Sequence, residues 1–136
     1  MPPKPLRKAP ATLRKAAASA SPEALAITQA LLRAADQLAI SDGVLARVLG
    51  VPQTMVTRLR NGGEALPEDG KAQELAILFT RLARSLDAIV DGDAKAAREW
   101  MNHHNPVLDG TPMETMQTIV GLMAAIDYLD APKPIF

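Results

Sequence analysis

The chain has 136 residues, 48% of them hydrophobic and only 3% aromatic, which is enough for one domain with an aliphatic core. It has no cysteine, which excludes disulfides, thiolate catalysis and cysteine-ligated zinc. No apolar run approaches the ~18 residues of a membrane span, and the N-terminus lacks the apolar stretch of a signal peptide, so we expect a cytoplasmic protein without a membrane segment. The net charge is zero, but the charges are unevenly distributed along the chain. Residues 1–22 carry five basic residues and no acid, whereas residues 64–136 carry six basic residues and twelve acids. This gradient suggests two partners of opposite charge, although a basic tail on an ordinary acidic domain would give the same pattern.

The chain begins with a segment of different composition from the rest. Residues 1–20 are rich in proline, alanine and basic residues, which is typical of a flexible arm. The first helix is predicted to follow Ser21, a favourable N-cap, with Pro22 at its first position. Its apolar residues recur every three or four positions as far as Leu38, as expected for one buried helix face.

The stretch Ser41–Gly62 has the pattern of a DNA-binding helix-turn-helix, in which two short helices meet at a steep angle. Ala46 is small where the helices would touch, and Gly50 tolerates the positive φ that the turn needs. Hydrophobic residues fill the positions that would hold both helices on a core: Leu45, Leu49, Val51, Val56 and Leu59. A helical hairpin with a polar outer face can show the same pattern by chance, but we favour DNA binding.

The second helix of this pair would enter the major groove of DNA. Because Val56 and Leu59 face the core, the remaining polar side chains of this helix point outward. We expect base contacts from Gln53, Thr54, Thr57 and Arg58, and phosphate contacts from Arg47 and Arg60.

The second half of the chain also has helical patterns. Pro67 is predicted to start a long helix with acids in its first turn and an apolar stripe that runs to Val90. A short helix around Trp100 follows, and Thr111 and Glu114 form a capping box for a last helix. That helix carries apolar residues at helical spacing, namely Met113, Met116, Ile119, Val120, Met123, Ile126 and Leu129. Its methionines are core filler by default, but methionine also suits an adaptable protein-binding surface. With no strand pattern in the sequence, we predict an all-α protein.

No group of residues has the pattern of an active site or a metal centre. His103 and His104 are adjacent, so they would point apart on any regular element, and there is no cysteine to complete a zinc site. We therefore expect a protein that is not an enzyme and that needs neither a cofactor nor a metal.

The order of these elements resembles the Xre/MbcA/ParS antitoxins over roughly residues 24–130. The most specific features are Trp100 before a turn, the pair Asn105-Pro106, and Gly110 with Pro112. The resemblance implies a homodimer that binds operator DNA through a helix-turn-helix. It also implies a partner, a RES-domain toxin that consumes NAD or transfers ADP-ribose; together the two would repress their own promoter.

The resemblance further implies a toxin-binding surface near the end of the sequence. We expect it to include Trp100, Asn105, Pro106, Met113, Met116, Met123, Tyr128, Lys133, Ile135 and Phe136. Several antitoxins of this family obstruct the active-site cleft of the toxin with their C-terminal end. Here Pro132 and Pro134 would leave residues 131–136 as an extended tail suited to this role, and a frayed terminus is the alternative.

These interpretations divide the chain into three parts. Residues 1–20 form a basic flexible arm, residues 21–90 a helix-turn-helix domain with a long connecting helix, and residues 91–136 a small helical toxin-binding domain. The alternative function is a stand-alone transcriptional regulator of the Xre type, without a toxin partner, whose C-terminal helices only dimerise.

Overall fold

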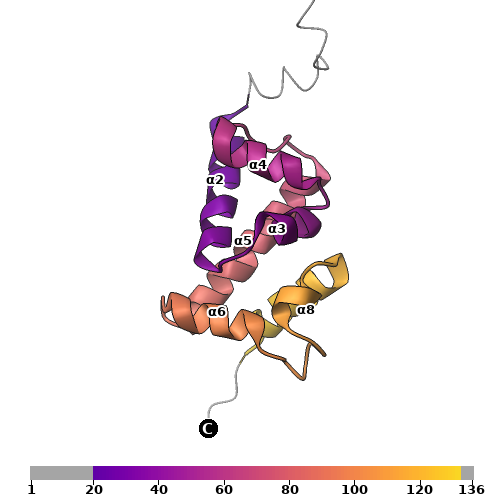
Figure 1. The fold of residues 1–136 in the computed structure, drawn as a ribbon. Coiled ribbons are helices and arrows are strands. Elements are labelled where there is room, and N and C mark those ends of the chain that lie inside the picture. Colours follow the sequence, from indigo (N-terminus) through magenta and orange to yellow (C-terminus); the bar gives the residue numbers. More distant parts are fainter. Residues whose placement is uncertain (1–19, 133–136) are drawn as a thin grey trace, which may run out of the picture.

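The computed structural model describes residues 20–132, and this part of the chain is helical, as predicted (Figure 1). It contains seven helices: α2 (Pro22–Gln37), α3 (Asp42–Leu49), α4 (Gln53–Gly62), α5 (Lys71–Ile89), α6 (Ala94–Asn102), α7 (Pro112–Thr115) and α8 (Ile119–Asp130). Residues 20–132 contain no strand, only one isolated antiparallel bridge between Asn105 and Gly110. The predicted arm, apart from Ala20, and the tail residues Lys133, Ile135 and Phe136 lie outside the described residues.

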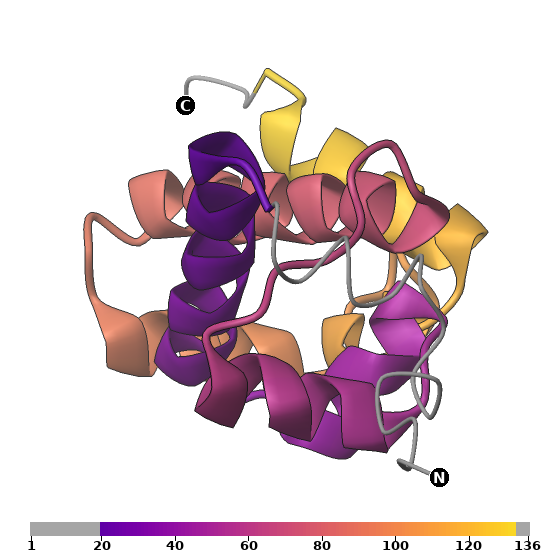
Figure 2. The same ribbon diagram turned by 90° about the horizontal axis from the view of Figure 1, so that it is seen from above.

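Helix α5 is the central element of the fold. Helices α2 and α3 and the C-terminal helix α8 all pack against it, and Figure 2 shows α8 on one side of α5, α3 and α4 on the other, and α2 crossing α5. On its buried face Phe79, Leu82 and Leu86 are completely shielded from solvent. They belong to a single core to which α2, α3, α4, α6 and α8 also contribute. The predicted DNA-binding and toxin-binding parts therefore share one core.

Local capping sets several boundaries of the first three helices, and the predicted N-cap role of Ser21 is confirmed. The Oγ atoms of Ser21 and Ser41 accept hydrogen bonds from backbone N–H groups three residues further on, at 3.0 and 3.2 Å. Gly50 and Gly63 end α3 and α4 with φ angles of +69° and +64°, which favour glycine.

The predicted start of the long helix at Pro67 is wrong. Helix α5 begins at Lys71 instead, because Asp69 adopts a φ of +58° that interrupts any helix from Pro67. The N–H of Gly70 donates to the carbonyl oxygen of Pro67 at 3.4 Å, so these residues form a turn that precedes the helix. The apolar stripe of the helix itself is confirmed, since Leu75, Phe79, Leu82 and Leu86 are buried.

The prediction of one last helix starting after Thr111 is also wrong. Thr111 does cap a helix, but only the four-residue α7, and Thr118 then caps α8 by accepting a backbone N–H at 3.0 Å. This second start changes which residues of α8 face the core. Ile119 and Val120, which the sequence pattern groups with the other apolar residues of one last helix, are 57% and 81% exposed, whereas Ile126 is fully buried.

Gly121 allows α7 and α8 to pack closely, since a Cβ atom at this position would lie 1.7 Å from the carbonyl oxygen of Thr115. We expect Gly121→Ala to lower the free energy of unfolding by at least about 2 kcal/mol, because the clash is with backbone. Gly62→Ala is the matched control: its Cβ would have no neighbour closer than 3.5 Å, so we expect a change within about 1 kcal/mol. Urea unfolding measures both, and equal stability of the two variants would contradict the close packing.

Candidate functional surfaces

Helices α3 and α4 pack against each other and are joined by the turn at residues 50–52. Val56 and Leu59 of α4 face the core, with 0% and 5% of their surfaces exposed, as the helix-turn-helix pattern requires. The four residues predicted to contact bases are all exposed, namely Gln53, Thr54, Thr57 and Arg58. Arg58 has one loose ion pair, with its Nε 3.8 Å from Glu64 Oε2, which leaves its guanidinium largely accessible.

The geometry does not support the predicted phosphate contact of Arg60. Its Nε lies 2.6 Å from Asp42 Oδ1 and its Nη1 lies 2.9 Å from Asp36 Oδ1, and only 26% of the side chain is exposed. The hydrogen bond to Asp42 is the main reason why the pKa of Arg60 is raised above its ordinary value. Since Asp36, Asp42 and Arg60 belong to α2, α3 and α4, this ion-pair group fixes the relative positions of the three helices.

Arg47, the other predicted phosphate contact, is exposed in the last turn of α3. Its Nε donates a hydrogen bond of 2.7 Å to Oε1 of Gln117, which lies between α7 and α8. Nothing in the sequence indicated this pair, because the two residues are 70 positions apart.

The loop after α6 is organised by Asn105. Its side-chain Oδ1 accepts the N–H groups of Val107 and Leu108 at 2.9 and 3.2 Å, and its backbone N–H donates to Gly110 at 2.9 Å. Asn105 is only 7% exposed, so it shapes the loop rather than presenting itself to a partner. Pro106 and Val107 lie at the surface of this loop, and Val107 is 71% exposed.

The other predicted toxin-binding residues differ in exposure. Trp100 and Tyr128 stack with ring centroids 6.2 Å apart, and both are half-buried, as are Met113 and Met123. Met116 is 1% exposed and therefore belongs to the core, so its side chain is not on the surface that the prediction requires.

The sequence pattern does not reveal the most exposed apolar residues of this part of the chain, namely Val107, Ile119 and Val120. Nothing in the sequence pattern distinguishes Val107, and Ile119 and Val120 fit the apolar spacing of one last helix. The signal that could have revealed them is Thr118, an N-cap residue type placed directly before them.

Comparison with known families identifies the C-terminal part of the chain. Residues 85–132 match the family model described as the antitoxin Xre/MbcA/ParS C-terminal toxin-binding domain. The chain carries an Xre/MbcA/ParS toxin-binding domain. A search of curated proteins gave no match. The toxin-binding domain comprises the end of α5 together with α6, α7 and α8.

Exposed apolar side chains are concentrated in the toxin-binding domain. Among residues 20–132 the large hydrophobic residues with high exposure are Ile77, Ile89, Val107, Ile119 and Val120. All but Ile77 lie within the matched range. Clusters of such side chains mark surfaces that a partner covers, whereas single ones are common on any protein.

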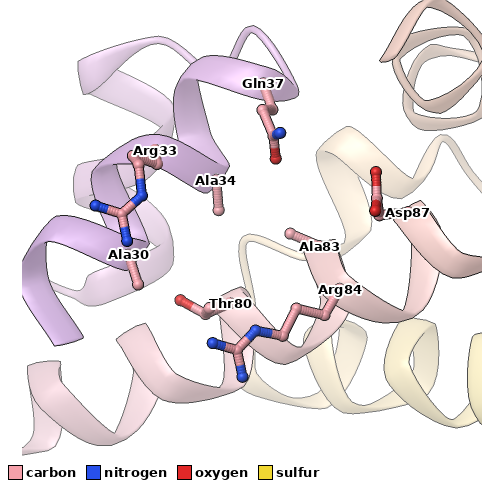
Figure 3. Close-up of a pocket in the computed structure, with 8 residues that line it drawn as sticks. All are labelled: Ala30, Arg33, Ala34, Gln37, Thr80, Ala83, Arg84 and Asp87. Atoms are coloured by element: carbon pink, nitrogen blue, oxygen red, sulfur yellow. The ribbon is translucent and has the colours of Figure 1, made fainter. Parts of the chain in front are cut away.

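A hollow of about 410 Å³ lies between α2 and α5, outside these surfaces. Figure 3 shows Arg33 from α2 and Arg84 from α5 on the two sides of this hollow, with Thr80 near Arg84 and Asp87 towards the other end. None of the residues predicted to bind DNA or a toxin lines it.

The described residues provide no metal centre: between residues 20 and 132 no three His, Asp or Glu side chains come together to hold an ion. His103 and His104 are both exposed, and Nδ1 of His103 contacts the carbonyl oxygen of Glu99. In the same range no helix is both long and apolar enough to cross a membrane.

Proposed function

We propose that this protein is the antitoxin of a toxin–antitoxin pair, a non-enzymatic cytoplasmic homodimer that neutralises a RES-domain toxin and represses its own promoter. The observation that carries the proposal is the toxin-binding domain at residues 85–132. The RES-domain, NAD-consuming nature of the toxin and the homodimer rest on the resemblance of roughly residues 24–130 to Xre/MbcA/ParS antitoxins.

We assign toxin binding to three exposed apolar side chains of this domain, Val107, Ile119 and Val120, and call them together the valine–isoleucine surface. Each of these side chains is more than half exposed, and complete burial of one of them contributes about 1.5–3 kcal/mol to an association. Trp100 and Tyr128 stack within the same domain and help to hold its helices in place. The excess of acids in residues 64–136 suits a basic partner surface.

We assign operator binding to α3 and α4. The support is the positive φ of Gly50 between them, the burial of Val56 and Leu59, and the exposure of all four predicted base contacts. In a helix hairpin that does not bind DNA, none of these four side chains would contact a base. Substituting them therefore distinguishes a DNA-binding helix pair from a purely structural one.

Val120→Asp should weaken toxin binding at least tenfold, because a carboxylate would have to be desolvated in an apolar contact. Purified wild-type and variant proteins are titrated with the RES-domain product of the neighbouring gene by calorimetry. Thr57→Asp, on an exposed position of α4, is the control and should bind the toxin like the wild type. Equal affinity of Val120→Asp and the wild type would show that the toxin binds elsewhere.

Thr57→Ala and Arg58→Ala should each weaken binding to the upstream promoter DNA by about 1–3 kcal/mol, the usual value of a good base contact. Both residues are exposed, so the fold and toxin binding should be unaffected. Electrophoretic mobility shifts measure the effect, with Val120→Asp as a control that keeps full DNA affinity. Promoter binding by Thr57→Ala and Arg58→Ala at wild-type affinity would refute the assignment of α4.

A further inference from the structure

One side-chain hydrogen bond joins the predicted DNA-binding helices to the toxin-binding domain. Arg47 Nε in α3 donates to Gln117 Oε1 at 2.7 Å. Gln117 is itself fixed, because its Nε2 donates to the carbonyl oxygen of Met113 at 3.1 Å. The side-chain amide of Gln117 therefore holds a fixed orientation between α3 and α7. Figure 1 shows how α3 and the C-terminal helices are arranged.

The hydrogen bond to Gln117 fixes the Arg47 side chain but leaves most of its N–H donors available. A guanidinium has five N–H donors in a rigid planar fork, and Gln117 uses only the one on Nε. Both terminal nitrogens stay available in an exposed side chain at the last turn of α3. An arginine whose plane is already fixed loses less rotamer freedom when it binds a phosphate.

We propose that Gln117 is a positioning residue for DNA binding, which orients Arg47 so that its terminal nitrogens contact a phosphate of the DNA backbone. This inference rests on the proposed DNA binding by α3 and α4. It means that the toxin-binding domain contributes to DNA affinity without touching DNA. Gln117 is two residues from Ile119, so a toxin bound on the valine–isoleucine surface lies next to this contact.

The test is a double-mutant cycle with Arg47→Ala and Gln117→Leu, using a duplex from the upstream promoter region as the probe. Arg47→Ala should reduce the slope of log affinity against log salt concentration by about 0.9, the value for one lost phosphate contact. Gln117→Leu should lower the affinity about three- to tenfold with the slope unchanged, because Arg47 keeps its charge but loses its orientation. In the Arg47→Ala background Gln117→Leu should have no further effect.

Gln29→Leu, at an exposed position of α2, is the matched control and should bind DNA like the wild type. Thermal unfolding verifies that each variant is folded. Wild-type affinity of Gln117→Leu, or an equal loss in the Arg47→Ala background, would overturn the inference while the proposed function stands. If the wild-type protein does not bind the duplex, the DNA-binding assignment fails and the inference fails with it.

Discussion

Both proposed functions depend on the burial of one face of α5. Phe79, Leu82 and Leu86 on that face are fully shielded, and α2, α3 and α8 pack against the same helix. The helices that carry the proposed contacts are between four and twelve residues long, and helices of this length are marginal in water on their own. Their packing on α5 therefore supplies the stability that their own sequences lack.

The shared core also limits how far the two functions can be separated. Arg60 ties α2, α3 and α4 together through Asp36 and Asp42, and Arg47 ties α3 to the segment between α7 and α8. Asp130 at the end of α8 accepts from Ser85 and Arg81 of α5, at 2.6 and 2.7 Å, which lowers the pKa of its carboxyl group. Hydrophobic burial holds these helices together but has no preferred direction. The polar contacts at the edges of the core therefore fix the orientation of the helices.

Features that depend on neighbouring residues can be predicted from the sequence. Contacts between residues that are far apart in the chain cannot. Ser21 and Gly50 act within one turn of their own helices, so the sequence predicts their roles. Thr118 was overlooked because the stripe from Met113 to Leu129 fits a continuous helix equally well. The partners of Arg60 and Arg47 lie far away in the chain, and no local sequence pattern predicts such pairs.

We propose that one core presents a toxin-binding surface and a DNA-binding surface at different places. Hydrogen–deuterium exchange of the protein alone, with the RES-domain product of the neighbouring gene, and with promoter DNA tests it most directly. We predict that the toxin slows exchange in residues 105–110 and 118–122, and that DNA slows it in residues 47–60. Protection of residues 47–60 by the toxin, with no change in residues 105–122, would show that the toxin does not bind at the proposed surface.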